Sequence, residues 1–255
     1  MASMDSEQSQ FNKIAQYYDA LMECVPYKHW VGFVLEVVKR AGLKPQNALD
    51  LACGTGTVSE LLLREGFNVV GVDISPQMIL AAKRKAAEKK LNIEYHIQDA
   101  AHLSLGRSFD LVVSLFDSIN YITDPCDLQS AFQKVNGHMR SGGLFIFDVN
   151  TEYALSHGFF NQSNIGTFDY PRYVWTSTYD RSSRLCRVDM VFEVMEPNGS
   201  KRQFTEVHLQ RAYRLDELES MLKNAGFDAT NVYDNFSFRP PKRRTDRAVF
   251  AAKKP

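Results

Sequence analysis

The chain has 255 residues, 44% of them hydrophobic, which is enough to bury one large core and predicts a single domain with appendages. Thirty Lys and Arg residues balance thirty Asp and Glu residues, so no net field would hold a nucleic-acid backbone or an anionic membrane surface. Apolar runs such as 111–116 and 143–149 are far shorter than the roughly 20 residues of a membrane span.

The N-terminal residues MASMDSEQSQ lack the basic and apolar stretches of a secretory signal, which leads us to expect a cytoplasmic protein. The four cysteines are scattered without a CxxC pair, and neither they nor the six histidines show metal-ligand spacing. We therefore expect reduced thiols, no bound metal, and neither a nucleic-acid nor a membrane partner. The sequence leaves open whether the chain is a monomer or a homodimer.

The first predicted elements are two amphipathic helices. Apolar residues recur at helical spacing over 11–21 and again over 30–38, and Pro26 separates the two blocks. We expect residues 1–41 to form a helical cap that precedes the core.

Short apolar runs then alternate with helical patterns. The runs predict strands at 47–52, 67–73, 93–97, 109–116 and 143–149, and the patterns predict helices over about 57–65, 75–90 and 125–140. Ser75 is a good N-cap for the second helix, and Pro76 suits its first position. Gly142 and Gly143 are expected to stop the third helix. Apolar strands between helices imply a parallel sheet covered on both faces, which is a doubly wound α/β architecture.

The pattern changes after residue 150. Alternation with period two over 186–194 and 205–209, joined by a turn at 197–199, predicts an antiparallel hairpin. Residues 173–180 are expected to add a third strand. A small antiparallel β insertion is therefore predicted after the fifth core strand.

The last part of the chain returns to the core pattern. The predicted elements are a helix at 214–226 and two strands at 232–236 and 247–254. We thus expect a seven-stranded, mostly parallel Rossmann-like sheet built from residues 42–150 and 211–255. The insertion, residues 151–210, is expected to act as a substrate lid.

The segment LDLACGTG places an acid and two glycines at the end of the first strand. In an open parallel sheet, ligands bind beyond the carboxyl ends of the strands, and Gly54 and Gly56 let the backbone approach a ligand closely. Asp50 would repel a pyrophosphate but attract an ammonium group. Asp73, at the end of the second strand, is placed to accept hydrogen bonds from ribose hydroxyls. Ser59 stands where a dinucleotide site would have its third glycine, which disfavours a nicotinamide cofactor.

Four motifs in chain order resemble one known family. DLACGTG, GVDIS with Met78, QDA at 98–100, and FDLVVSLFDSINY together resemble the class I S-adenosylmethionine-dependent methyltransferases. The insertion, with HLQRAYRLDEL at 208–218, is similar to that of bacterial small-molecule members such as the sugar-amine N,N-dimethyltransferases. The resemblance implies S-adenosyl-L-methionine as the methyl donor and S-adenosyl-L-homocysteine as its product.

The resemblance also implies roles for individual residues. Asp50, Ala52, Gly54 and Gly56 would hold the methionyl part of the cofactor, Asp73 the ribose, Met78, Asp99 and Ala100 the adenine, and Leu115 with Phe116 the wall beside the sulfonium. Tyr18 and Trp30 of the leading helices would close over the cofactor, and Tyr17 is a candidate catalytic residue from the same motif. Ordinary core packing is the alternative for Met78 and for the two tyrosines.

The acceptor side is predicted from the ends of the fourth and fifth strands and from the aromatic insertion. Asp117 is the first candidate for a base or an orienting group, and a helix-capping role is its alternative. The candidate substrate-binding residues are Tyr121, Asn150, Tyr170, Trp175 and Arg239. The rings of the insertion have an alternative place in the core of the small sheet.

The predicted function is methyl transfer to a small molecule, at nitrogen or oxygen, by direct in-line displacement. Such a reaction needs alignment and a dry site rather than a covalent enzyme intermediate. The alternatives are an RNA methyltransferase, a non-catalytic protein that binds a nucleoside ligand, and an NAD-dependent dehydrogenase.

Overall fold

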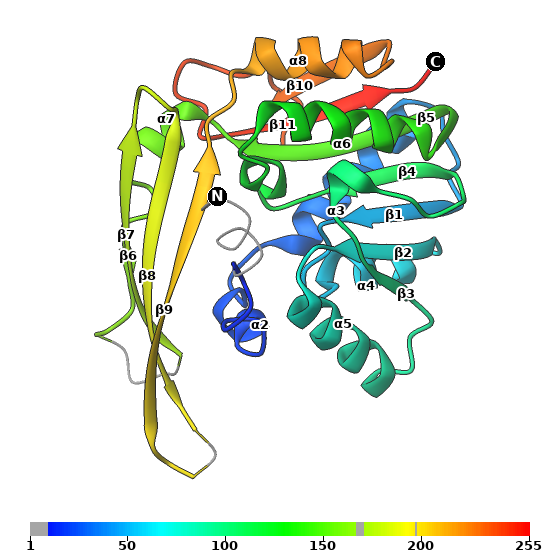
Figure 1. Cartoon of the computed structure of the whole chain (residues 1–255). Helices are drawn as coiled ribbons and strands as arrows, with labels where there is room; N and C mark the ends of the chain where they lie inside the picture. The colour runs from blue at the N-terminus through cyan, green and yellow to red at the C-terminus, as the bar shows by residue number, and fades with distance from the viewer. Residues whose placement is uncertain (1–9, 167–170, 197) are drawn as a thin grey trace.

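The computed structural model describes residues 10–166, 171–196 and 198–255. The core is a seven-stranded sheet in the order β10-β11-β5-β4-β1-β2-β3 (Figure 1). Its strands are β1 (Asn47–Leu51), β2 (Asn68–Asp73), β3 (Glu94–Ile97), β4 (Phe109–Ser114), β5 (Met139–Asn150), β10 (Ala229–Asp234) and β11 (Arg247–Lys253). β11 runs antiparallel to β5 and β10, while the pairings from β5 to β3 are parallel. The predicted mostly parallel sheet is confirmed.

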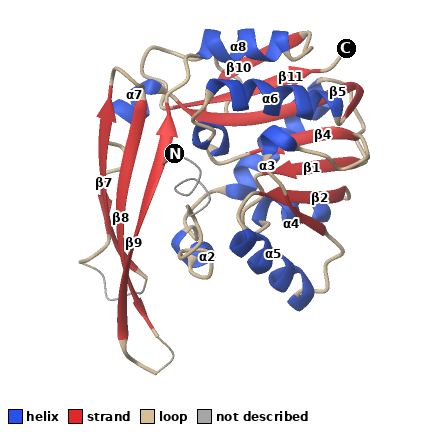
Figure 2. Ribbon diagram, in the orientation of Figure 1, coloured by secondary structure: helices blue, strands red, loops and turns tan. Residues whose placement is uncertain are grey.

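Helices cover both faces of this sheet (Figure 2). They are α3 (Tyr27–Arg40), α4 (Thr57–Arg64), α5 (Pro76–Glu88), α6 (Pro125–Gly137) and α8 (Leu215–Asn224). Two short helices, α2 (Tyr18–Leu21) and α7 (Glu152–Ser156), lie on the side of the insertion. Phe132 of α6 and Leu222 of α8 pack in one hydrophobic cluster, and Val34 of α3 and Leu62 of α4 pack in another. The doubly wound architecture therefore follows from strands that are apolar on both faces. No helix within the described ranges is long and apolar enough to cross a membrane.

The insertion forms a second, antiparallel sheet in the order β6-β7-β8-β9. Its strands are β6 (Gln162–Ser163), β7 (Arg172–Asp180), β8 (Leu185–Met195) and β9 (Lys201–Arg211). The sheet stands beside the edge at which β1 ends, with the N-terminal segment and α2 between it and the core (Figure 1). Cys186, Val188 and Phe192 alternate onto one face of β8 and pack in a cluster with Ile14 and Leu155. The predicted antiparallel hairpin and the period-two pattern of β8 are thus confirmed, whereas in β9 the buried face carries residues 206, 208 and 210 rather than 205, 207 and 209.

Two predicted helix boundaries are wrong. Residues 10–17 form turns, so the first helix is reduced to α2. Phe11 has a left-handed φ of 66°, and the N–H groups of Tyr17 and Tyr18 bond three residues back, to Ile14 and Ala15, rather than four. α6 ends at Gly137 rather than near residue 140. Gly142 and Gly143 do not cap it but lie inside β5, where the pairing register with β4 shifts and a β-carbon on Gly143 would approach the Asp110 carbonyl.

Two glycines provide a matched test of packing in this fold. A β-carbon at Gly71 in β2 would lie 2.5 Å from the Tyr95 ring and 3.0 Å from Cys53 Sγ, whereas one at Gly32 on the exposed side of α3 meets nothing within 4 Å. We expect Gly71→Ala to lower the free energy of unfolding by about 1–3 kcal/mol through overpacking. Gly32→Ala should raise it by about 0.5–1 kcal/mol through helix propensity. Urea unfolding of both variants checks the pair, and a Gly71→Ala protein as stable as the parent would contradict the packing described here.

Candidate active site

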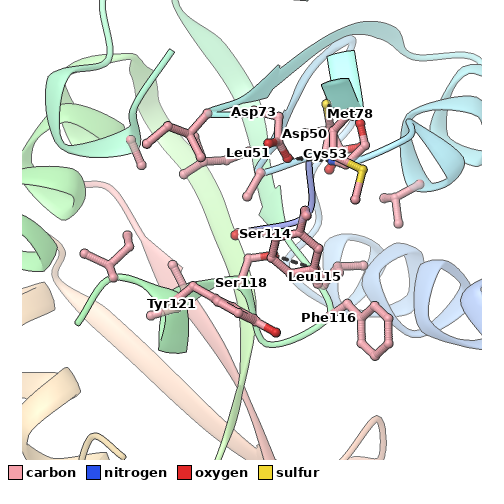
Figure 3. Close-up of a pocket in the computed structure, with 18 of the residues that line it drawn as sticks. Asp50, Leu51, Cys53, Asp73, Met78, Ser114, Leu115, Phe116, Ser118 and Tyr121 are labelled. Carbon is pink, nitrogen blue, oxygen red and sulfur yellow. Dashed lines mark hydrogen bonds between the residues drawn. The ribbon is translucent and has the colours of Figure 1, made fainter. Parts of the chain in front are cut away.

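A cavity opens at the carboxyl ends of β1, β2 and β4 (Figure 3). Asp50 and the loop after β1 line it, with Asp73 on the side of β2 and Leu115 on the side of β4. Phe11 and Tyr18 of the N-terminal segment line it as well. The site therefore combines the end of the core sheet, where ligands bind in this class of fold, with the segment that precedes the core.

The loop after β1 has an unusual backbone. Ala52, Gly54 and Gly56 have φ angles of 58°, 54° and 80°, in the left-handed region that side chains disfavour. A β-carbon on Gly56 would collide with the hydroxyl of Tyr95. The glycines are thus required by the turn and by the close approach of β3, and they leave the backbone of the loop bare toward the cavity.

Asp73 holds this loop in place. One carboxylate oxygen accepts a hydrogen bond from the N–H of Gly54 and the other from the N–H of Ser75, both at 2.8 Å. Burial raises the pKa of Asp73, while these backbone N–H groups oppose the shift. Each oxygen keeps a further lone pair, so Asp73 can brace the loop and still accept hydroxyl groups from a ligand.

Asp50 is a buried carboxyl group with few polar partners to offset its loss of hydration. It is 2% exposed, and Ser59 Oγ donates a hydrogen bond of 2.5 Å to it. Burial raises the pKa of Asp50 to about 7, and no ion pair to this carboxylate is found in the described part of the chain. A buried carboxylate without a cation is costly, so the site is electrostatically suited to a ligand that brings a positive charge.

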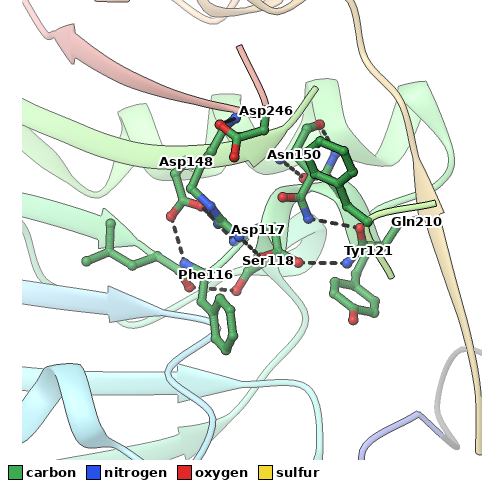
Figure 4. A network of polar contacts seen from close by, with 12 residues as sticks. Phe116, Asp117, Ser118, Tyr121, Asp148, Asn150, Gln210 and Asp246 are labelled. Carbon is green, nitrogen blue, oxygen red and sulfur yellow. Dashed lines mark hydrogen bonds and ion pairs between the residues drawn. The ribbon is translucent and has the colours of Figure 1, made fainter. Parts of the chain in front are cut away.

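A polar network fixes the opposite wall of the cavity (Figure 4). Phe116 and Asp117 follow β4 with left-handed φ angles of 70° and 50°. Asp148 at the end of β5 accepts their backbone N–H groups at 2.7 and 2.9 Å. Arg247 pairs with both Asp148 and Asp117, and its guanidinium lies over the rings of Phe116 and Trp30. The network therefore maintains a strained turn that presents Phe116 to the cavity.

Asp117 is not placed as a free base. Its carboxylate pairs with Arg247 at 2.8 Å and accepts a hydrogen bond from Gln210 Nε2 at 2.7 Å. It is 5% exposed and is not among the residues that line the cavity. The structure gives Asp117 a positioning role in joining the end of β4 to β9 and β11.

Most of the other predicted site residues meet at the cavity. Those that line it are Tyr18, Asp50, Ala52, Gly54, Asp73, Met78, Asp99, Ala100, Leu115, Phe116 and Tyr121. Asp99 also caps the short helix η1 (Ala100–His102) by accepting the N–H of Ala101 at 2.9 Å. The adenine and ribose assignments thus concern residues on one continuous wall.

Several predicted residues lie elsewhere. Tyr17 accepts a hydrogen bond from Arg202 on β9, and Trp30 stacks on Phe236 behind Phe116. Gly56 turns the chain into α4 rather than lining the cavity. Partners distant in sequence hold Tyr17 and Trp30 away from the cavity, whereas Gly56 is placed by the local turn, in which its N–H bonds to the Cys53 carbonyl.

The acceptor residues are likewise dispersed. Asn150 is buried and donates to Gln210 Oε1 at 3.2 Å. Trp175 packs in the core of the insertion near Phe192, as the alternative reading proposed, and Arg239 is exposed with its Nε directed at Ser237 Oγ. Tyr170 lies outside the described residues.

The structure adds residues that sequence reasoning missed. Gln10, Phe11, Tyr27 and Gln98 line the cavity, and the hydroxyl of Tyr121 lies 3.2 Å from Nδ1 of the buried His208. The signal in the sequence is weak, because nothing local to residue 208 indicates a partner 87 residues away. The period-two pattern even misleads here, because it would turn Thr205, Val207 and Leu209 inward. In β9 the buried residues are instead the polar Glu206, His208 and Gln210.

Comparison with known proteins agrees with this geometry. A family model described as a methyltransferase domain matches residues 48–143. A relative from Geobacillus sp. (strain WCH70), named only as a methyltransferase, is 30% identical over 96% of this chain and 99% of its own length. The crystal structure of an S-adenosylmethionine-dependent methyltransferase from Clostridium acetobutylicum ATCC 824 superposes with a TM-score of 0.84 at 32% identity, over 96% of this chain and 98% of that one.

A third relative has a named substrate. The dTDP-3-amino-3,4,6-trideoxy-alpha-D-glucopyranose N,N-dimethyltransferase of Streptomyces venezuelae is 25% identical over 76% of this chain and 80% of that enzyme. The match is longer than the methyltransferase domain itself. The likeness therefore extends beyond the part of the chain that the family model covers.

The buried carboxyl group of Asp50 makes a pH-dependent prediction. Because its pKa is raised to about 7, the folded protein keeps a proton that the unfolded chain releases from about pH 4 upward, so the free energy of unfolding falls as the pH rises through this window. Asp50→Asn cannot titrate and should gain about 2–3 kcal/mol on the parent protein between pH 5 and pH 8. Urea unfolding at the two pH values measures this gap. The exposed Asp228→Asn serves as the control, and an equal gap at both pH values for Asp50→Asn would count against the assignment.

Proposed function

Because the chain belongs to the S-adenosylmethionine-dependent methyltransferases, we propose that it methylates a nitrogen atom of a small polar acceptor, with amino sugars as the first candidates. The observation that carries the cofactor part of this proposal is the pairing of a bare glycine loop with two carboxyl groups, the buried Asp50 and the half-buried Asp73, at the ends of adjacent strands. Oxygen is the second acceptor atom to be tested.

The residues of the cavity suit S-adenosylmethionine. Asp50 has no cation of its own among the described residues, so its carboxylate would be neutralised by the ammonium group of the methionyl part. Asp73 has spare acceptor capacity for the ribose hydroxyls. Met78 and Ala100 offer apolar contacts to the adenine, beside the polar Asp99. When bound, S-adenosylmethionine supplies a methyl group activated by a positively charged sulfur.

The chain's own residues then align the acceptor and exclude water. Leu115 and Phe116 form an apolar wall, and the left-handed turn held by Asp148 keeps that wall rigid. Tyr18 and Phe11 line the same cavity from the N-terminal segment. Positive charge is dispersed rather than created during methyl transfer, so orientation in a dry site supplies most of what the reaction needs.

We assign the insertion, residues 151–210, the role of an acceptor lid and residues 1–41 the role of a cap. Glu206 of β9 binds the backbone of Lys13 and Ile14, which places the cap between the lid and the cavity. The amino-sugar assignment draws on the Streptomyces venezuelae relative, whose name specifies an amino-sugar nucleotide.

Cofactor binding tests the first part of the proposal. We expect S-adenosylmethionine to bind with a Kd in the low micromolar range or below, about −8 kcal/mol. Asp73→Ala should weaken binding by about 1–3 kcal/mol through lost hydrogen bonds. Calorimetry measures both. Asp180→Ala serves as the control, because Asp180 lies at the exposed end of β7 and its side chain bonds only to neighbouring serines among the contacts described. Unchanged affinity in Asp73→Ala would refute the ribose assignment.

Acceptor choice tests the second part. We expect the enzyme to methylate a dTDP-linked amino sugar and to leave the matching hydroxy sugar unmodified, because only the amine becomes a strong nucleophile at neutral pH. Mass spectrometry of the two reactions, run at equal concentration, counts the methyl groups added. Methylation of the hydroxy sugar alone would assign oxygen as the acceptor atom, and methylation of RNA in place of both would overturn the small-molecule assignment.

A further inference from the structure

A buried carboxylate and a buried histidine lie directly behind the cavity. Glu206 and His208 are 6% and 1% exposed, and both come from β9 of the insertion. His208 Nε2 lies 2.9 Å from a carboxylate oxygen of Glu206, and Nδ1 lies 3.2 Å from the hydroxyl of Tyr121. Tyr121, from the short helix η2 (Ser118–Tyr121), lines the cavity. The three side chains thus form a continuous chain from the interior to the place where an acceptor would lie.

The contacts of Glu206 assign the proton on the histidine. Its carboxylate accepts the backbone N–H groups of Lys13 at 2.8 Å, Ile14 at 3.0 Å and Phe11 at 3.2 Å. Glu206 Oε2 accepts the N–H of Phe11 and also faces His208 Nε2, so we assign the ring hydrogen to Nε2, which donates it to Oε2. Nδ1 of the neutral ring is then free to accept the hydrogen of the Tyr121 hydroxyl.

An aromatic ring packs against Tyr121 and His208 and shields them from water. The ring of Phe11 lies 4.4 Å from the ring of His208 and 5.0 Å from that of Tyr121, between centroids. Burial is the main cause that raises the pKa of the Tyr121 phenol, with a smaller contribution from the charge of Asp117. Tyr121 therefore stays a phenol, which can receive a proton on its oxygen only while it passes its own proton on.

We propose that Tyr121, His208 and Glu206 form a proton relay that takes a proton from the acceptor amine before methyl transfer. The inference rests on the proposed function. An amine that arrives as an ammonium ion has no lone pair with which to attack. One ammonium proton moves to the Tyr121 oxygen while the phenolic proton moves to His208 Nδ1, and the carboxylate of Glu206 stabilises the resulting imidazolium.

The remaining bonds balance without a further reactant. The freed lone pair of the nitrogen forms the new bond to the methyl carbon, and the electron pair of the broken carbon–sulfur bond stays on sulfur. His208 releases its proton to solvent when the site opens. Tyr121 is the catalytic residue of this scheme because it touches the acceptor, and His208 and Glu206 are positioning residues that act through it.

A purely structural role for the three residues predicts different results, because Glu206 also binds the N-terminal segment to the insertion. Two substitutions of His208 separate the structural role from proton transfer. His208→Asn keeps an acceptor near the Tyr121 hydroxyl but cannot take a proton, and His208→Gln keeps a donor toward Glu206 but removes the basic nitrogen. Tyr121→Phe removes the shuttle itself. Tyr179→Phe is the matched control, since Tyr179 on β7 bonds to Glu152 and is not among the residues that line the cavity.

Steady-state kinetics with the amino-sugar acceptor is the first measurement. We expect Tyr121→Phe, His208→Asn and His208→Gln each to lower kcat by about a hundredfold, with the affinity for S-adenosylmethionine and the melting temperature unchanged. The Tyr121→Phe, His208→Asn double variant should lose no more than either single variant, because the two residues act as one unit. A His208→Asn enzyme with kcat close to that of the parent would overturn the relay, and so would losses confined to KM and melting temperature.

The second measurement needs no acceptor. In ¹⁵N-labelled protein at neutral pH, with His208 assigned from the His208→Asn spectrum, we expect the neutral ring with hydrogen on Nε2. Tyr121→Phe should shift the Nδ1 resonance, and Tyr179→Phe should leave it unchanged. An Nδ1–H tautomer or an imidazolium in the resting protein would overturn the relay. If the parent enzyme methylates no amine, the proposed function fails on the acceptor assay, and the tautomer still decides the relay.

Discussion

The rest of the site depends on the contacts of one buried carboxylate, that of Asp148. It ends β5, accepts two backbone N–H groups from the turn after β4, and pairs with Arg247 at the start of β11. Asp117 and Gln210 extend the same network to β9 of the insertion. Removal of one member would leave the others as buried groups without partners, which is far costlier than the loss of an exposed ion pair. The network therefore sets the position of the Phe116 wall and the attachment of the insertion together.

Asp50 differs from Asp148 in how far its burial is compensated. Asp148 is also fully buried, but two N–H groups and a guanidinium compensate it. Asp50 has a single hydrogen bond from Ser59 and a pKa raised to about 7 by burial. The difference lies in the neighbours rather than in the depth of burial. A chain that leaves one strand-end carboxylate uncompensated loses stability in exchange for affinity toward a cation, and this fits the ammonium group of S-adenosylmethionine.

The cofactor side could be predicted from the sequence because its signals are local. Asp50, Gly54 and Asp73 lie at strand ends that the apolar runs already mark, and the parallel sheet brings those ends to one edge. The acceptor side depends on partners far apart in the chain. The position of Asp117 after β4 suggests a base, but its carboxylate pairs with Arg247, which lies 130 residues later and gives no local signal in the sequence. His208 had no visible partner because Tyr121 and the N-terminal segment reach it only after the insertion has folded against the core.

The N-terminal segment is held from two sides, and the two attachments differ in kind. On the side of the core, Asp19 pairs with Lys85 of α5, but its side chain is 49% exposed, so solvent and salt screen the contact. On the side of the insertion, Glu206 binds three backbone N–H groups in a buried setting. The second attachment resists separation far more than the first, because breaking it would strand an ionised carboxylate in the interior.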